Sequence, residues 1–439
     1  MFEVKEKPEM VERALLVRIS LNRREQDEDE ALLEELNELV TTLGIGIEDE
    51  MLVHARSEHK KFICGTGKAE EIATFAKAIE CDVIVFDNML APMQQRAWEE
   101  ITGVTVIDRE EVILDIFAGR AQTKEAILQV ELARMQYALP RMKKMWGHLD
   151  REGGGGVGGG AASRGMGEKQ IEVDRRLARK RIDRIKEDLA IVRKQRKTRR
   201  KDREKYEVPH AAVVGYTNAG KSTLLNKISG ADVLAADMLF ATLDTTTRRI
   251  ELPDGQPLLV TDTVGFVRNL PTRLVEAFKA TLEEAVLADF LLHVLDASNP
   301  QALKFYTTTM EVLKELGADD KKMITVLNKA DLVEDEAQLT ALVTQLPNTV
   351  LISAVTGQGL EHLEQKCTEL LMERIQVNTY RIPQSKGNLI SILHQESKVI
   401  NIEYEGADVV VQAAVSPALA GKLKEYHDVE APHVTEPEW

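Results

Sequence analysis

Eight residues near the middle of the chain have the types and spacing of a phosphate-binding loop. Residues 215–222 read G-Y-T-N-A-G-K-S, which fits the pattern G-x-x-x-x-G-K-S. An apolar run at 211–214 predicts a buried strand before the loop, and residues 222–228 predict a helix after it. Small residues let backbone N–H groups surround phosphate oxygens at a helix N-terminus, where the partial positive charge favours anions. The pattern therefore predicts a site for a nucleoside phosphate.

Two side chains of this loop have distinct expected roles. Lys221 is expected to reach the β- and γ-phosphates, and the Ser222 hydroxyl is expected to ligate Mg²⁺. The residues predicted to contact the nucleotide here are Gly215, Tyr216, Thr217, Asn218, Ala219, Gly220, Lys221, Ser222 and Thr223.

Later motifs indicate which base is bound. Two apolar runs predict strands that end in D-T-V-G at 262–265 and in N-K-A-D at 328–331. Asp262 suits the hydration shell of Mg²⁺, and the Gly265 N–H suits the γ-phosphate. The Asp331 carboxylate can accept the N1 and N2 donors of guanine, a pair that adenine does not offer, so we predict GTP as the substrate. The predicted contacts of this group are Asp262, Thr263, Val264, Gly265, Asn328, Lys329, Ala330 and Asp331, followed by Ser353, Ala354 and Val355 after a last strand.

The ordered set of motifs separates a GTPase from chance matches. Any one motif is also found in ordinary strand-to-helix turns, but together they indicate a doubly wound α/β domain with ligands at the carboxyl ends of its strands. Residues 239–248 hold several Thr residues, one of which can ligate Mg²⁺ and order the segment only in the GTP state. Position alone does not choose among them.

The residue after D-T-V-G predicts slow turnover by the free protein. Many GTPases have Gln there, whose amide orients the attacking water, whereas this chain has Phe266. Because Phe266 can neither donate nor accept such a hydrogen bond, we expect a partner to stimulate hydrolysis. The alternative is that another group already positions the water.

Composition favours a soluble cytoplasmic protein of several domains. A length of 439 residues is enough for about three domains. The three cysteines, Cys64, Cys81 and Cys367, are far apart, which argues against a disulfide framework or a zinc site and for a reducing compartment. There is no apolar run of about 18 residues, so we expect no membrane insertion.

Charge is divided unevenly along the chain. Residues 169–205 hold 17 Lys and Arg against 7 Asp and Glu, a net charge of +10, so the remainder carries −25 of the total of −15. One basic arm on an acidic body indicates a local contact with a polyanion.

The predicted fold class is α/β, with a doubly wound, mostly parallel P-loop GTPase sheet and three further parts. The expected divisions are an N-terminal α/β domain with a parallel sheet at 1–118, a helical hairpin at 119–205, the GTPase domain at 206–376, and a small α+β domain at 377–439 with a loose tail. Residues 65–68 read G-T-G-K before a helix that begins near Ala69. They could bind a second phosphate, but a plain turn is favoured because the motif is too short for a phosphate-binding loop.

The hairpin prediction rests on two apolar seams with heptad spacing. One seam is Leu128, Leu132, Met135, Leu139, Met142 and Trp146; the other is Ile171, Ala178, Ile182, Ile185, Leu189 and Val192. Pro140 is expected to kink the first helix. Between the helices, the loop 153–167 has nine Gly among its 15 residues. We favour a nucleic-acid contact for this tip and the basic second helix over a passive linker and a solvated charged face.

Several of these motifs resemble the HflX family of translational GTPases, over about residues 14–427. The most specific are G-Y-T-N-A-G-K-S-T at 215–223, F-A-T-L-D at 240–244 and D-T-V-G-F at 262–266. Residues 65–68, 86–88, 130–133 and 164–170 also look like the family. The family has Pro where Thr245 and Met166 stand in this chain.

The resemblance implies specific roles and partners. Thr242 would be the Mg²⁺-ligating Thr, and Lys221, Thr242 and Gly265 would serve catalysis. The same segment would supply the nucleotide contacts Phe240, Ala241, Thr242, Leu243 and Asp244. Asn218 looks like the Asn that helps to place K⁺ in some related GTPases. The implied function is binding to the large (50S) ribosomal subunit and its rRNA, and separation of stalled or stress-arrested ribosomes into subunits, with ATP binding by the N-terminal domain and RNA unwinding also attributed to such proteins.

Three functions remain open from the residues alone. The first is a monomeric ribosome-splitting GTPase of the cytoplasm, without DNA or membrane partners. The second is a large-subunit assembly factor or rRNA chaperone that uses the same basic arm. The third is a signalling switch that binds only proteins, against which the basic hairpin counts.

Overall fold

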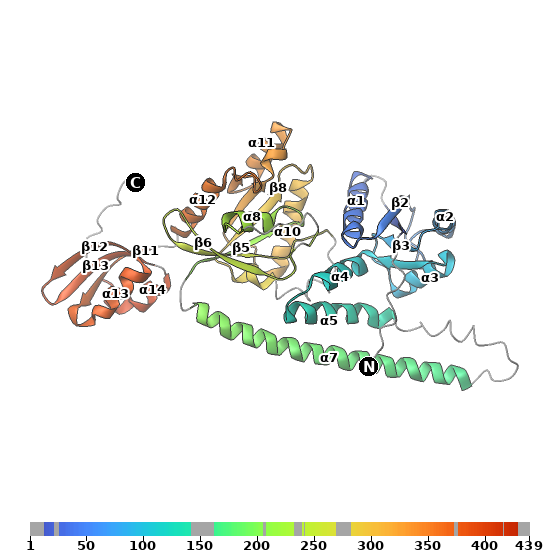
Figure 1. Cartoon of the computed structure of the whole chain (residues 1–439), viewed down its shortest axis with the longest axis horizontal. Helices are drawn as coiled ribbons and strands as arrows, with labels where there is room; N and C mark the ends of the chain where they lie inside the picture. Colours follow the sequence, from blue (N-terminus) through green and yellow to red (C-terminus); the bar gives the residue numbers. More distant parts are fainter. Residues whose placement is uncertain are drawn as a thin grey trace.

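The computed structural model describes residues 13–21, 26–141, 162–204, 208–231, 239–240, 242–268, 282–372, 376–415 and 417–428. Their strands form sheets of four, six and three strands, which follow one another along the chain. In Figure 1 these sheets lie on the right, in the centre and on the left, and the long helix α7 (Ala162–Glu204) runs along the lower edge. Most of the predicted Gly-rich loop, residues 153–161, lies outside the described ranges, and its last residues are already helical in α7.

The first sheet has the strand order β2-β1-β3-β4, and every pairing in it is parallel, which confirms the predicted parallel sheet. Its strands are β1 Arg13–Ser20, β2 Gly46–His54, β3 Val83–Phe86 and β4 Thr105–Asp108. Its helices are α1 Gln26–Thr42, α2 Thr66–Ala78, α3 Pro92–Thr102 and α4 Arg109–Arg120. Strand β2 has a weak strand signal in the sequence, because its first five residues, G-I-E-D-E, are mostly polar; they are half-buried or exposed in the structure.

Alternate residues of these strands face two different cores. Leu16 and Val85 pack with α1 and α4 on one face of the sheet. Leu15 and Ile84 pack with α2 and α3 on the other face. The first of these cores continues without a break into the central part of the molecule, where it includes Phe240 and Phe266. The N-terminal part is therefore packed directly against the segments that carry the nucleotide motifs.

Helix α5 (Lys124–Arg141) and helix α7 pack side by side as the predicted hairpin. On α7 the predicted seam is buried at Ala178, Ile182, Ile185 and Leu189. On α5 the predicted seam residues Leu128, Leu132, Met135 and Leu139 are half-buried, while Met142 and Trp146 lie outside the described ranges. The fully buried side chains described on α5 are Ala126, Gln129, Val130, Ala133 and Tyr137. Two neighbours explain this pattern, since α5 also packs against α4. Pro140 is the penultimate residue of α5.

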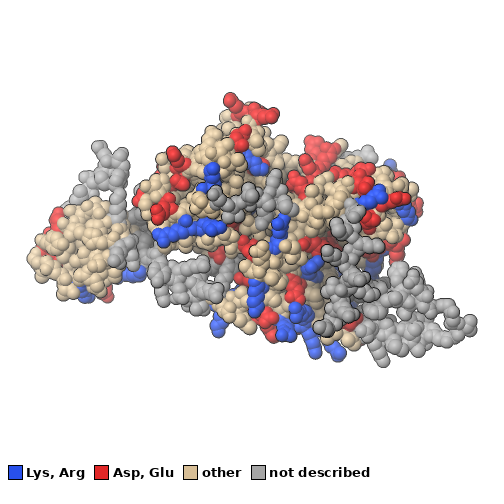
Figure 2. All heavy atoms as spheres, in the orientation of Figure 1, with Lys and Arg blue, Asp and Glu red and all other residues tan. Residues whose placement is uncertain are grey.

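Among the side chains of α7 whose burial is described, the basic ones are largely exposed. Arg176, Arg179, Lys180 and Arg184 lie outside the buried seam. In Figure 2, Lys and Arg gather along the lower edge of the molecule near α5 and α7, whereas Asp and Glu gather over α1 and α11 at the upper edge. The charge division that the sequence predicts is therefore also a division in space.

The central sheet has the strand order β10-β9-β8-β5-β7-β6, and only β6 runs antiparallel to its neighbour. Its strands are β5 His210–Gly215, β6 Thr246–Glu251, β7 Pro257–Asp262, β8 Phe290–Asp296, β9 Met323–Asn328 and β10 Thr349–Leu351. Its helices are α8 Lys221–Ile228, α10 Ala302–Leu316, α11 Glu336–Gln345 and α12 Leu360–Met372, with the 3₁₀ turn η3 Ala330–Leu332. Helices α8 and α12 cover one face and α10 covers the other, as the doubly wound prediction requires.

The last part of the chain forms a small antiparallel sheet of order β11-β13-β12. Its elements are β11 Gln376–Pro383, η4 Gln384–Lys386, α13 Gly387–Glu396, β12 Lys398–Glu405, β13 Asp408–Val415, α14 Pro417–Lys422 and η5 Lys424–Tyr426. One face of the sheet packs against α13 and α14 through Tyr380, Val411 and Leu393. The elements follow in the order strand, helix, two strands and helix, an α+β arrangement.

Candidate nucleotide site

The predicted nucleotide residues converge at the carboxyl ends of β5, β7 and β9. The Asn328 side chain connects two of these loops, because its Nδ2 donates to the Ala219 carbonyl (2.8 Å) and its Oδ1 accepts from the Ala354 N–H (2.9 Å). Gly220 has a φ of +91°, and a Cβ there would lie 2.2 Å from Asn328 Nδ2. Only glycine therefore allows this close approach between the phosphate-binding loop and Asn328.

Lys221 lies buried beneath the loop. Its ammonium donates to the Tyr216 carbonyl at 2.7 Å. Burial lowers the pKa of Lys221 to about 8, an effect that the nearby Asp262 carboxylate partly offsets. The ammonium is therefore still mainly protonated at neutral pH and is held where phosphate charge would be compensated.

Ser222, Thr242 and Asp262 form a cluster of oxygens beside Lys221. The Ser222 hydroxyl lies 2.7 Å from the Thr242 hydroxyl, and both donate to Asp262 Oδ2, at 2.6 Å and 2.9 Å. Burial raises the pKa of Asp262, while Lys221 and the two hydroxyls lower it in part. Asp262 Oδ1 is buried without a hydrogen-bond partner in the described part of the chain. Hard oxygen donors and an unsatisfied carboxylate oxygen fit Mg²⁺, which Ser222 and Thr242 would ligate.

The segment after Asp262 lies against the phosphate-binding loop. The Thr217 N–H donates to the Phe266 carbonyl (2.8 Å), and the Phe266 N–H donates to the Gly215 carbonyl (3.1 Å). A Cβ on Gly265 would lie 2.8 Å from Lys221 Nζ, so this position also requires glycine. The Phe266 ring is 2% exposed and lies in the core, so its side chain leaves the site to other groups.

The predicted base-recognition motif, N-K-A-D at 328–331, follows β9. Lys329 has a φ of +61°, and its ammonium is 2.7 Å from Asp296. Asp331 lies in η3 with an exposed side chain, and Ser353 is fully buried in the loop between β10 and α12. Val355 is 72% exposed. This arrangement leaves the Asp331 carboxylate accessible to a guanine edge.

Two predicted contacts point elsewhere in this structure, and a third lies outside it. The Phe240 ring packs on Phe117 of α4, with ring centroids 4.6 Å apart. The Asp244 carboxylate accepts hydrogen bonds from the start of α5. Ala241 lies outside the described residues. In this structure the side chains of Phe240 and Asp244 contact the N-terminal half, and their contacts with the nucleotide stay a prediction.

A buried ionic network, which the sequence analysis missed, joins the N-terminal part to the site. The Tyr216 hydroxyl donates to Glu35 Oε1 (2.8 Å), and the Arg268 backbone N–H donates to the Tyr216 hydroxyl (2.6 Å). Arg268 Nε and Arg109 Nη2 also donate to Glu35, at 2.9 Å and 2.5 Å. Arg109 completes the network with a 2.7 Å bond to Asp87.

The charges of this network are matched. Burial lowers the pKa of Arg109, but Glu35 and Asp87 outweigh it and raise the value overall. The Tyr216 ring stacks on Phe305 at 4.0 Å between centroids. No local pattern signals this arrangement, because Glu35 and Arg268 are 233 positions apart.

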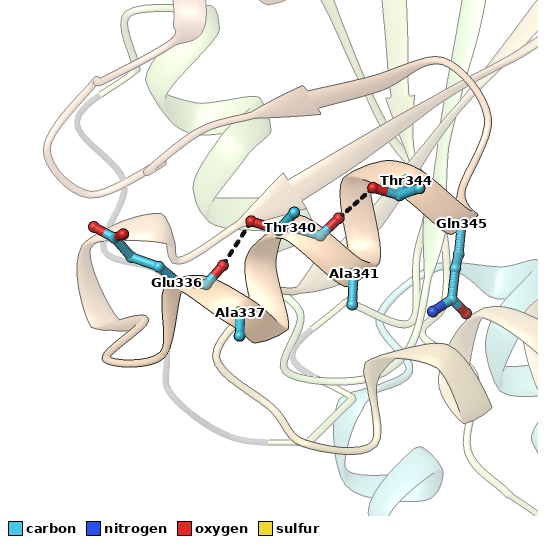
Figure 3. Close-up of a pocket in the computed structure, with 6 residues that line it drawn as sticks. All are labelled: Glu336, Ala337, Thr340, Ala341, Thr344 and Gln345. Atoms are coloured by element: carbon cyan, nitrogen blue, oxygen red, sulfur yellow. Dashed lines mark hydrogen bonds between the residues drawn. The ribbon is translucent and has the colours of Figure 1, made fainter.

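Within the described residues, neither the G-T-G-K stretch at 65–68 nor a depression on α11 gathers ligand groups as the site above does. Helix α2 begins at Thr66 and not near Ala69, so residues 66–68 form its first turn and the expected separate turn is absent; the Lys68 ammonium is 2.6 Å from Glu71. A shallow depression runs along one helix, α11 (Figure 3). Its Thr340 and Thr344 hydroxyls donate to carbonyls of the same helix, at 2.8 Å and 2.7 Å.

Comparisons with known proteins agree with this geometry. Three family models match, described as GTP-binding GTPase N-terminal over residues 30–118, GTP-binding GTPase Middle Region over 120–203, and 50S ribosome-binding GTPase over 210–329. A GTPase HflX of Akkermansia muciniphila is 57% identical over 433 residues, which cover 97% of this chain and 99% of that protein. The chain belongs to the HflX family of GTPases.

Other HflX relatives match over nearly the same span. The GTPase HflX of Escherichia coli K12 is 43% identical over 385 residues, which cover 88% of each chain. Among solved structures, a GTP-binding protein from Sulfolobus solfataricus in complex with GDP is 24% identical, with a TM-score of 0.43 over 82% of this chain and 99% of that one.

Membership of the HflX family establishes the reaction. The chain is a P-loop GTPase that hydrolyses GTP, and its central sheet carries the GTP site. None of the helices in the described ranges is long and apolar enough to cross a membrane.

Proposed function

We propose that this HflX protein binds the large ribosomal subunit through its α5/α7 hairpin and uses GTP to separate stalled or stress-arrested ribosomes into subunits. The observation that carries the proposal is the exposed basic face of α7, on an otherwise acidic protein. The match to a family described as 50S ribosome-binding GTPase supports the choice of partner. The proposed protein acts as a cytoplasmic monomer.

Within the site, each group has a proposed task. Lys221 compensates charge on the β- and γ-phosphates, and the Gly265 N–H donates to the γ-phosphate. Ser222 and Thr242 hold Mg²⁺, which supplies further charge neutralisation when it is bound, and Asp262 holds its hydration shell. We also propose that Asn218, whose φ is +59°, helps to place K⁺, so replacing K⁺ by Na⁺ should slow hydrolysis.

The ribosome proposal is tested by sedimentation with a non-hydrolysable GTP analogue. The protein should sediment with mature large subunits and should convert stalled ribosomes into subunits when GTP is supplied. Sedimentation with precursor particles alone would instead support the alternative of a large-subunit assembly factor or rRNA chaperone. Sedimentation with neither particle would contradict both.

Charge reversal on α7 tests the surface that makes this contact. The variant replaces Arg175, Arg176, Arg179 and Lys180 by Glu, and leaves Arg181 unchanged because it pairs with Glu131 at 2.6 Å. If each side chain meets one phosphate, the slope of log affinity against log salt should fall by about three units. A matched control reverses four exposed lysines away from the arm, Lys60, Lys77, Lys314 and Lys424. Equal salt slopes for the arm variant and the control would contradict the proposed surface.

A further inference from the structure

The start of α5 is held by a carboxylate from the GTP site. Asp244 Oδ2 accepts the backbone N–H groups of Gln122 (2.9 Å) and Thr123 (3.0 Å), and Asp244 Oδ1 accepts the Thr123 hydroxyl. Thr123 Oγ1 also accepts the Ala126 N–H at 3.2 Å. Free N–H groups at a helix start favour a negative charge, so Asp244 acts as a cap supplied from a distant part of the chain.

Thr242 lies in the sequence between Phe240 and Asp244, which contact α4 and the start of α5. Two residues before it, Phe240 is 2% exposed and packs on Phe117 in the last turn of α4. Two residues after it, Asp244 is bonded to the start of α5. Thr242 itself lies 2.7 Å from Ser222 and 2.9 Å from Asp262. The corner between α4 and α5 therefore determines where the Thr242 hydroxyl sits.

The same helix α5 packs against the basic arm formed by α7. It packs along the buried seam of α7, and Arg181 of α7 pairs with Glu131 of α5 at 2.6 Å. A displacement of the arm would consequently act on Gln122 and Thr123, the two residues that bind Asp244. Both of these residues are exposed, so the link is made at the surface, where it can break and reform.

We propose that Asp244 is a positioning residue for GTP hydrolysis, which places Thr242 at the Mg²⁺ site only while the start of α5 is in reach. The position of α5 and α7 thereby controls whether the segment around Thr242 is ordered for Mg²⁺ binding. The step from Asp244 to Thr242 stands on the contacts above, and the claim that ribosome binding uses it rests on the proposed function.

The first experiment uses the full-length free protein and GTP alone, with Asp244→Ala. We expect kcat to fall about tenfold, equivalent to about 1.4 kcal/mol. The Mg²⁺ concentration for half-maximal rate should rise about fivefold or more, because a ligand is no longer held in place. GDP affinity should change less than about twofold, since the phosphate-binding loop and Asp331 are untouched. Asp254→Ala, in the exposed turn between β6 and β7, is the matched control.

The partner residue supplies the second readout. Thr123→Ala should reproduce part of the defect, and Thr123→Ser should restore it, because serine keeps the hydroxyl donor. The double variant Asp244→Ala with Thr123→Ala should be no slower than Asp244→Ala alone. Wild-type Mg²⁺ dependence in Asp244→Ala, additive defects in the double variant, or an equal loss of GDP affinity would overturn the proposal.

The third experiment separates this inference from the ribosome proposal. With purified large subunits added, Asp244→Ala should bind as tightly as the wild-type protein but be stimulated about tenfold less. If wild-type protein failed to bind large subunits while the Mg²⁺ defect of Asp244→Ala persisted, the proposed partner would be wrong and the positioning role would stand. Full stimulation of Asp244→Ala would refute the coupling to the arm.

Discussion

The N-terminal half touches the GTP site at two junctions of opposite character. At the phosphate-binding loop, Glu35 meets Arg109, Arg268 and Tyr216, and all four side chains are nearly fully buried. In the segment that carries Thr242, the Asp244 carboxylate accepts hydrogen bonds from the exposed start of α5. Both junctions use a carboxylate as acceptor, so the difference lies in access to water.

Access to water sets what each junction is able to do. Removing one partner of a buried ionic network leaves uncompensated charge and costs about 3–5 kcal/mol. Losing a helix cap at the surface costs about 1 kcal/mol, because water replaces the missing acceptor. The buried junction is thus suited to fixing the N-terminal part on the GTP site. The exposed junction is weak enough to open and close, so a partner that fixes the arm is able to stabilise it.

The largest expected effect is at the buried junction. Glu35→Ala leaves Arg109 and Arg268 without their shared carboxylate. We therefore expect the free energy of the first unfolding transition in urea to fall by about 3–5 kcal/mol. Glu34→Ala changes an exposed residue of the same helix and should stay within about 0.5 kcal/mol of wild type. Similar losses in the two variants would show that the network does not hold the two parts together.

Base recognition should be independent of both junctions. Asp331→Asn removes a charged acceptor of two guanine N–H groups, so we expect GTP affinity to fall about 100-fold, or about 2.7 kcal/mol, and xanthine nucleotides to be preferred. Asp335→Asn is the control, because Asp335 caps α11 by accepting the Ala337 N–H at 2.8 Å. Unchanged GTP affinity in a nucleotide titration of Asp331→Asn would contradict the assigned base contact.

The two junctions also mark where reasoning from sequence succeeded and failed. Residues such as Lys221, Ser222 and Asp262 end or follow apolar strands, so a parallel sheet necessarily brings them together. Glu35 lies in a helix that is recognised from the spacing of its apolar residues, and no local feature distinguishes Glu35 from the exposed Glu34. Its partners come from three distant segments, so only the assembled fold shows why it is buried.

The hairpin shows the same limit on a smaller scale. Heptad spacing predicted the buried seam of α7, where α5 is the only neighbour among the described helices that it packs against extensively. On α5 the described seam residues are only half-buried, because this helix packs against both α4 and α7 and also buries Ala126 and Tyr137. The resemblance of its motif implies that Asp244 contacts the nucleotide, which stays a prediction, whereas its hydrogen bonds to the start of α5 were not predicted.

The central claim is that the arm connects a large-subunit contact to GTP hydrolysis. Phe266 is buried and offers no polar group to the attacking water, so the free protein should turn over slowly. The decisive measurement is the steady-state GTPase rate with and without purified large ribosomal subunits. We predict stimulation of at least about tenfold, or about 1.4 kcal/mol, which is lost when Arg175, Arg176, Arg179 and Lys180 are replaced by Glu. Equal rates with and without large subunits would contradict the claim.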